Sequence, residues 1–352
     1  MITHPPRVGI IANPVSARDI RRIVAHAGSL QITDRANIVL RLLAGLNAAG
    51  IEHVLMMPEN SGIRHHVVRG LRRSANLGES RFPDIEYLDM AVTSSAEDSI
   101  RAARLMREAG VSAIIVLGGD GTHRAVVSAC GDVPIAGVST GTNNAFPAFK
   151  EPTIVGLAVG LAVTEEMLSE IAFQDNKLLE VDIAGRKEIT LVDVTVVAER
   201  YVGARALWRT ESFKELYVTF AETEAIGMSV VAGLLDPVDR RTPEGRRVVF
   251  DFSDQANYLL RAPIAPGLIE EIGIDSWHTL LPDIPFPVAQ REGSIALDGE
   301  REFSFSRNDR PTVTLCTNAF RTIDVAACMK FAARTRLFHD NNADRHVTQR
   351  ED

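Results

Sequence analysis

The first 140 residues alternate short, mainly apolar runs with segments whose apolar side chains recur at helical spacing. Strands that show no polar alternation are buried on both faces, and alternation of such strands with helices is typical of a parallel sheet covered on both sides. The pattern predicts a doubly wound α/β domain over residues 1–148. The predicted strands are Val8–Ala12, His53–Met57, Ala113–Leu117 and Pro134–Val138.

The hydrophobic pattern changes after residue 150. Val248, Phe250 and Phe252 alternate with other residues, as do Phe303 and Phe305. This period is typical of antiparallel strands with one face in water. We therefore expect three further regions: a β-rich substrate domain over 149–308, a segment over 309–338 that returns to the first domain, and a polar tail over 339–352.

Composition excludes several classes of protein. A net charge of −8 argues against a nucleic-acid or membrane-surface partner, because both need a basic excess. The longest apolar run, Ile154–Val163, is about half of the ~20 residues that a spanning helix needs. Three cysteines without CxxC spacing favour neither disulfides nor zinc. With no apolar signal segment after Met1, a cytoplasmic protein is expected.

The segment Leu117-Gly118-Gly119-Asp120-Gly121-Thr122 follows a predicted buried strand and precedes a predicted helix. Glycines permit unusual backbone angles and let a ligand approach the main chain, and a helix N-terminus suits phosphate. Asp120 would accept a proton from a hydroxyl or hold Mg²⁺ beside phosphates. The alternative is a tight strand-to-helix turn with Asp120 as its cap, and the residues alone leave both interpretations open.

A second polar loop, Ser139 to Pro147, follows the next predicted strand. Gly141, Thr142, Asn143 and Asn144 supply small donors and acceptors that suit a sugar or a base edge. Both loops would line one crevice, because open α/β sheets bind ligands at the carboxyl ends of their strands. An ordinary Asn-rich turn is the alternative.

Gly118-Gly119-Asp120-Gly121-Thr122 resembles the GGDGT signature of the superfamily that contains NAD kinases and diacylglycerol kinases. Asn13-Pro14 resembles its first-strand motif, and Gly141 to Asn144 lie where relatives carry a second Gly-Thr loop. Over about residues 7 to 335 the chain is similar to the ATP-NAD kinase-like AcoX branch, which is associated with acetoin-catabolism operons. The resemblance implies an NAD kinase-like fold, with an N-terminal Rossmann-like domain and a β-rich second domain.

The resemblance also implies an ATP- and Mg²⁺-dependent kinase that phosphorylates a hydroxyl. Asp120 would be the catalytic or Mg²⁺-organising carboxylate, and Asp193 and Glu300 would face the acceptor. The implied nucleotide-binding residues are Asn13, Gly118, Gly119, Gly121, Thr122, Gly141, Thr142, Asn143 and Asn144. We expect a small-molecule acceptor and a homo-oligomer, either a dimer or a tetramer.

NAD is a candidate ligand, but the chain departs from the NAD kinase pattern. Val192-Asp193 stands where those enzymes carry an Asn-Glu pair, and Thr223 to Ser229 has lost most of the hydroxyl residues of their acceptor segment. We therefore expect weak or no phosphorylation of NAD. The alternatives are a lipid or small-polyol kinase and a nucleotide-binding regulator of acetoin catabolism with little catalysis.

Three weaker signals complete the analysis. His123 is either a phosphate contact or a histidine on a helix surface. Asp298-Gly299 predicts a two-residue hairpin turn. Arg240-Arg241 and Arg246-Arg247 are expected to lie in a solvated loop.

Overall fold

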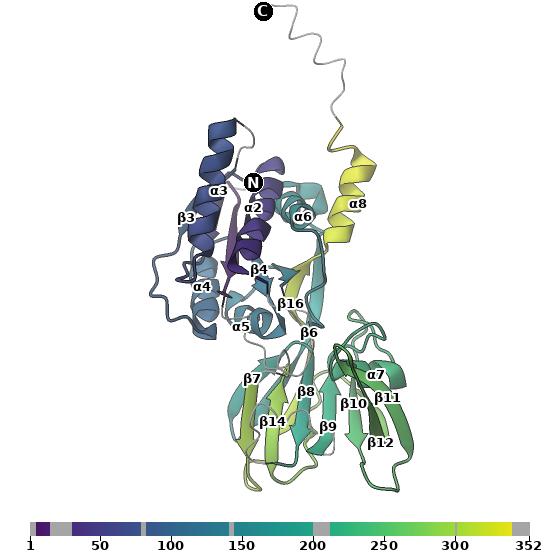
Figure 1. Ribbon diagram of the computed structural model, residues 1–352. Coiled ribbons are helices and arrows are strands. Elements are labelled where there is room, and N and C mark those ends of the chain that lie inside the picture. The colour runs from purple at the N-terminus through teal and green to yellow at the C-terminus, as the bar shows by residue number, and fades with distance from the viewer. Residues whose placement is uncertain are drawn as a thin grey trace, which may run out of the picture.

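The computed structural model describes residues 5–14, 30–78, 82–140, 144–199, 212–299 and 301–339. These residues form two sheets, and different helices pack against each of them (Figure 1). The first sheet contains β1 (Arg7–Ala12), β2 (His53–Met56), β3 (Asp84–Tyr87), β4 (Ala113–Gly118), β5 (Ile135–Ser139), β6 (Phe173–Ile183), β7 (Arg186–Thr190), β13 (Phe286–Pro287) and β16 (Thr312–Ile323). The second contains β8 (Asp193–Val197), β9 (Phe213–Val218), β10 (Gly245–Phe250), β11 (Tyr258–Ala265), β12 (Leu268–Leu280), β14 (Gly293–Leu297) and β15 (Arg301–Phe305).

The first sheet confirms the predicted parallel α/β architecture. Its order is β3-β2-β1-β4-β5-β16-β6-β7, and β1 to β5 pair in parallel. The described helices are α2 (Ile32–Ala48), α3 (Ile63–Leu77), α4 (Ala96–Glu108), α5 (Asp120–Cys130), α6 (Pro152–Thr164), η2 (Glu166–Leu168), α7 (Ser229–Leu235) and α8 (Val325–Thr335). One core cluster joins α2, α3, α6 and α8 to the sheet, and a second joins α4 and α5 to its other face.

Local capping signals explain where several helices begin. Ser95 accepts a hydrogen bond from the Glu97 amide and forms a capping box with Asp98 at the start of α4. Asp324 caps α8 through the Ala327 amide. Helix α2 begins after Gln31, which is its N-cap and whose amide donates to Asp34.

The chain enters the second sheet only at β8, later than the boundary expected at residue 148. Helix α6 packs on α2, and β6 and β7 extend the first sheet. Gly45 and Gly156 allow the close approach of the two helices, since a Cβ on either would overlap backbone atoms of the other helix. Strand β6 joins the first sheet by pairing with β16, which is distant in the sequence. The local hydrophobic pattern therefore did not separate the two sheets.

The C-terminal strand lies in the first sheet. Strand β16 pairs with β6 in antiparallel register and with β5 in parallel, and α8 contacts α6 (Figure 1). The second sheet has the order β11-β12-β10-β9-β8-β14-β15 and is antiparallel throughout, as its alternating pattern predicts.

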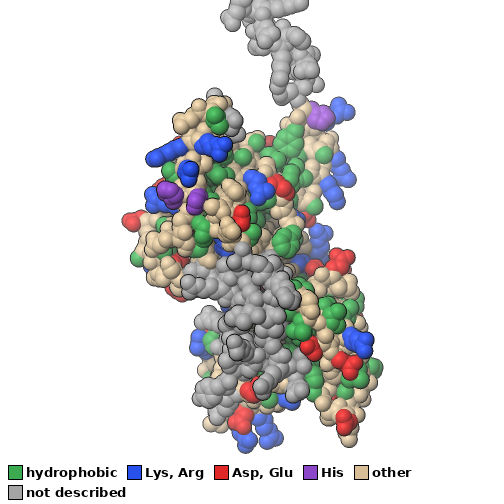
Figure 2. All heavy atoms as spheres, in the orientation of Figure 1, with side chains coloured by type: hydrophobic (Ala, Val, Ile, Leu, Met, Phe, Trp, Pro, Cys, Tyr) green, Lys and Arg blue, Asp and Glu red, His purple; other side chains and the backbone are tan. Residues whose placement is uncertain are grey.

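Among the described residues, no helix is both long enough and apolar enough to cross a bilayer. Basic side chains gather on the part of the surface formed by α3, whose exposed arginines include Arg69, Arg72 and Arg73 (Figure 2).

Candidate functional site

The GGDGT segment joins β4 directly to α5. Gly118 ends the strand, Gly119 is the helix N-cap, and Asp120 is the first helical residue. Neither Gly118 nor Gly119 has a positive φ angle, so the expectation that they supply unusual backbone angles is wrong. Their role is close packing: a Cβ on Gly118 would lie 2.5 Å from Thr122 Cβ, and one on Gly119 would lie 2.7 Å from Asn144 Oδ1.

The Asp120 carboxylate is buried at 2% exposure and connects the two predicted loops. Its Oδ1 accepts a hydrogen bond from the Phe146 amide at 2.9 Å, and its Oδ2 accepts one from the Ala145 amide at 3.0 Å. Charge-assisted bonds of this kind are stronger than neutral ones. Asp120 therefore holds the loop that follows β5 against the start of α5.

Asn144 makes a second connection between the loops. Its Nδ2 donates to Ser139 Oγ at 2.9 Å, while its Oδ1 lies over Gly119. The structure thus brings together the two loops that the sequence placed at one edge of the sheet. Gly141, Thr142 and Asn143 lie outside the described residues.

Asn13 ends β1 at the same edge of the sheet, but its amide is directed toward α4. The side chain is buried and donates to Ser95 O at 2.8 Å and to Ser99 Oγ at 3.0 Å. Its backbone carbonyl accepts a bond from Arg35, which is also buried. These contacts join β1 to the helix that follows the third strand.

Asp298 connects the second sheet to α5. Both Asp298 and Gly299 have positive φ angles and a hairpin joins β14 to β15, as predicted. Because Leu297 pairs with Arg301, the turn contains three residues, and the expectation of two is wrong. The fully buried Asp298 carboxylate accepts the Val192 amide at 2.9 Å and the Thr190 hydroxyl. Arg124 of α5 lies 3.8 Å from this carboxylate.

Asp193 lies where the chain enters the second sheet, at the start of β8. Its side chain is 6% exposed and accepts a bond from Thr195 Oγ1 at 3.4 Å, and its carbonyl accepts the Asp298 amide at 3.0 Å. Asp193 is therefore adjacent to the Asp298 turn. Glu300, the other predicted acceptor residue, lies outside the described residues.

His123 has neither of its two predicted roles. The ring is fully buried and its Nδ1 lies 2.8 Å from Gly119 O, so Nδ1 carries the proton and donates. Burial lowers the pKa of His123 to about 4. A neutral imidazole without solvent contact supports the GGDGT backbone from inside the core.

Arg240 is the functional candidate that the sequence missed. The expectation of a solvated loop is wrong for Arg240, which is partly buried, and for Arg246 and Arg247, which lie in strand β10. It holds for the exposed Arg241. Arg240 donates to the carbonyls of Ala145 at 2.6 Å and Phe146 at 2.8 Å. In the sequence, the only local signal near Arg240 is the turn Pro243-Glu244-Gly245. A turn does not reveal which residues distant in the chain an arginine contacts.

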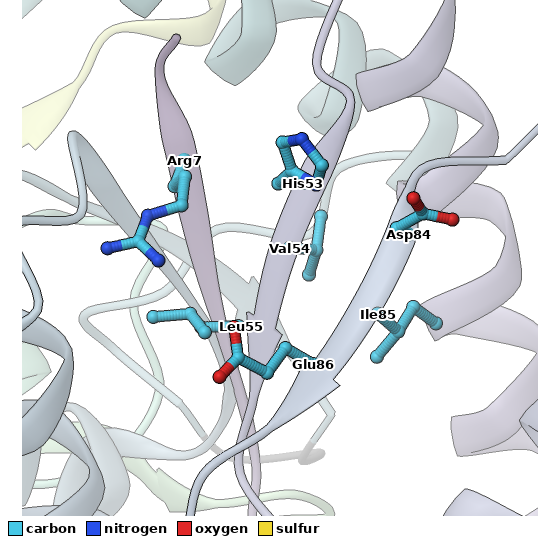
Figure 3. A pocket seen from close by; sticks show the side chains of 7 residues that line it. All are labelled: Arg7, His53, Val54, Leu55, Asp84, Ile85 and Glu86. Carbon is cyan, nitrogen blue, oxygen red and sulfur yellow. The ribbon is translucent and has the colours of Figure 1, made fainter. Parts of the chain in front are cut away.

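Two cavities lie in the first domain, one of them beside these contacts. One of about 210 Å³ lies beside the second loop, with Phe146, Lys150, Gln174, Asn176 and Arg240 in its lining. Another of about 380 Å³ lies on β1, β2 and β3, away from the GGDGT segment (Figure 3). In that view Glu86 of β3 lies near Leu55 of β2, with Arg7 on the neighbouring strand.

Two family models match this chain. The model of the ATP-NAD kinase N-terminal domain matches residues 8–162, and the model of the acetoin catabolism protein X C-terminal domain matches residues 177–318. A candidate diacylglycerol kinase from Bacillus anthracis str. Sterne aligns with 92% of this chain and 98% of its own, at 13% identity and a TM-score of 0.45. Acetoin catabolism protein X of Cupriavidus necator is 52% identical over 337 residues, which cover 94% of each chain. The chain therefore belongs to the acetoin catabolism protein X family and carries an NAD kinase-like N-terminal domain.

Proposed function

We propose that this protein catalyses ATP- and Mg²⁺-dependent phosphoryl transfer to a hydroxyl group of a nucleotide or small-molecule acceptor. The observation that carries the proposal is the convergence of Asp120 and Asn144 at the carboxyl edge of the first sheet. Open α/β sheets bind ligands at this edge. The matched kinase N-terminal domain supports the same class of reaction.

In this proposal the GGDGT segment and the second loop surround the nucleotide, and Asp120 organises them. Phosphoryl transfer needs positioning and charge stabilisation more than covalent help from the protein. When bound, Mg²⁺ would neutralise charge on the phosphates. The described residues contain no cluster of three or more His, Cys, Asp or Glu side chains suited to a metal. Asp120 would be the carboxylate beside the phosphates, and proteins hold Mg²⁺ with one or two carboxylates together with substrate phosphates.

The acceptor would lie toward the second sheet, near Asp193 and Glu300. NAD is a poor candidate, because Val192 is buried and its amide is bonded to Asp298, while Met228 packs against the core of the second sheet. Each polar group of NAD left unpaired there would cost roughly 1–3 kcal/mol. We extend the relative's printed role in acetoin catabolism to this chain, and propose a cytoplasmic homo-oligomer.

The test is transfer of labelled phosphate from Mg²⁺-ATP to a panel of NAD, small polyols, diacylglycerol and acetoin-derived alcohols. We expect transfer to a hydroxyl other than that of NAD. Asp120→Asn should lower turnover by at least ~10²-fold while ATP binding changes much less, because Asn keeps the shape of the side chain but can neither accept a proton from the acceptor hydroxyl nor organise Mg²⁺.

Asp132→Asn is the matched control, since Asp132 is exposed beyond the other end of α5. Its turnover should equal that of the unmodified protein. Normal turnover in a folded Asp120→Asn variant would remove Asp120 from the reaction.

One observation favours a second candidate, a nucleotide-binding regulator. Both oxygens of Asp120 accept backbone amides, which is also what a purely structural loop anchor requires. ATP binding without transfer to any acceptor in the panel would support the regulator.

A further inference from the structure

We propose that Arg240 is a positioning residue that couples the acceptor side of the second sheet to Asp120. This inference rests on the kinase activity proposed above. It concerns a chain of contacts, here named the Arg240 clasp: Asp120, the backbone of residues 145–146, Arg240 and Glu222.

The backbone of residues 145–146 is bonded from two sides. Its amides donate to Asp120, and its carbonyls accept from Arg240 Nη1 and Nη2. Ala145 and Phe146 therefore each have their backbone N–H and C=O engaged by two oppositely charged side chains. The planar guanidinium suits this arrangement, because its N–H groups are held in a rigid fork that an ammonium group lacks.

The other edge of the guanidinium pairs with Glu222. Arg240 Nε donates to Glu222 Oε1 at 2.7 Å, and Nη2 donates to Oε2 at 3.1 Å. The guanidinium also lies over the Phe220 ring, with its carbon 4.1 Å from the ring centroid. The Arg240 head group is thus oriented by the second domain while it contacts the loop of the first.

Glu222 directly precedes the segment that would recognise the acceptor. That segment is residues 223–229, the counterpart of the acceptor segment in NAD kinases. Helix α7 packs on it so closely that a Cβ on Gly233 would lie 2.7 Å from Glu222 O. If a bound acceptor displaced this segment, Glu222 would move with it. Arg240 and the loop that Asp120 holds would then move as well, because Arg240 is bonded to Glu222 and the loop is bonded to Arg240.

The loop that carries Arg240 is anchored independently of the clasp. Lys177 of β6 is 6% exposed and donates from Nζ to the carbonyls of Asp239, Thr242 and Glu244 at 2.6–2.9 Å. Because Lys177 fixes the loop backbone to the first sheet, a substitution at Arg240 alters the clasp and leaves the loop in place.

The experiment compares Arg240→Lys with Arg241→Lys, its matched control. Arg241 is the neighbouring residue, and its side chain is 73% exposed and paired with Asp324. In protein without ligand, Arg240→Lys should raise hydrogen exchange of the peptide covering residues 144–148 by at least about tenfold, while Arg241→Lys leaves it unchanged. Glu222→Gln should give a smaller increase, since it keeps the side-chain shape and removes the charge.

Turnover provides the second measurement. We expect Arg240→Lys to lower kcat by about 10²-fold with the KM for ATP changed by less than about threefold, because Arg240 bonds to residues 145–146, which Asp120 also holds, and these follow the expected nucleotide-binding residues 141–144. The Asp120→Asn and Arg240→Lys effects on kcat should also be less than additive, since both act through residues 145–146.

The exchange and turnover measurements test the Arg240 clasp and the proposed kinase function separately. Unchanged exchange at residues 144–148 in Arg240→Lys would overturn the clasp, whatever the activity. Increased exchange with unchanged kcat would overturn the positioning role. Failure of the unmodified protein to phosphorylate any acceptor would overturn the proposed kinase, and the positioning role with it, while the exchange data would still report on the contacts.

Discussion

The buried imidazole of His123 makes stability depend on pH. Its Nδ1 donates to Gly119, and its Nε2 has no hydrogen-bond partner among the described residues. The pKa of about 4 in the folded state lies below the ordinary 6.5, so the unfolded chain binds more protons between these values. Stability should therefore fall as the pH drops from 6.5 toward 4, by on the order of 2 kcal/mol by pH 5.

Urea unfolding at pH 7, 6 and 5 checks this prediction. His123→Asn should lose less stability over this range than the unmodified protein, because Asn retains a donor and does not titrate. His278→Asn, a change at an exposed histidine of β12, should follow the unmodified protein. Identical pH dependence in all three proteins would contradict the assignment.

At the scale of elements, the α2–α6 contact depends on two glycines. A Cβ on Gly156 would overlap the Leu42 carbonyl, and backbone atoms cannot move aside as a side-chain end can. Gly156→Ala should lower the free energy of unfolding by about 1–3 kcal/mol despite the better helix propensity of Ala. Chemical denaturation of the purified variant measures the change.

Gly70→Ala in α3 is the matched control. A Cβ there would approach only side-chain atoms of Leu40, the nearest a terminal methyl at 2.5 Å, and that side chain can rotate away. We expect its stability to change by less than about 1 kcal/mol, because the helix-propensity gain offsets the repacking. Equal stability of the two variants would show that α2 and α6 are not in close backbone contact.

At the scale of the whole molecule, the two sheets should unfold together. The chain passes between them from β7 to β8, from β12 to β13 and on to β14, and from β15 to β16. Arg124 and Arg240 add polar contacts between them. With so many connections, neither sheet can unfold while the other keeps its partners, which predicts one cooperative transition.

Two probes follow the two sheets separately. Fluorescence of Trp277 in β12 reports on the second sheet when the other tryptophan is removed by Trp208→Phe. The helical circular dichroism signal reports on the first domain, because six of the seven described α-helices, α2 to α6 and α8, pack there. The two probes should give one midpoint in thermal unfolding. Two separate midpoints would mean that the sheets are independent domains.

Much of the fold could be predicted because buried parallel strands leave continuous apolar runs in the sequence. The same logic placed Asp120 and Asn144 together, since carboxyl ends of neighbouring parallel strands meet at one edge. The hairpin at Asp298 was predictable because tight turns need positive φ angles that Asp-Gly tolerates, although the turn has three residues and not the predicted two. These are local signals, read within a few residues.

The roles of individual polar residues were decided by tertiary structure. Arg240 reaches a carbonyl 94 positions away, and Arg124 reaches one 173 positions away. No local period encodes such partners, so both arginines resemble ordinary surface residues in the sequence. His123 likewise looks like a helix-surface residue until packing buries it. Local hydrophobicity and backbone preference were therefore enough to predict four strands of the parallel sheet, the hairpin at Asp298 and the edge where the loops meet. Which polar groups are buried and bonded could not be predicted, because that depends on segments brought together from distant parts of the chain.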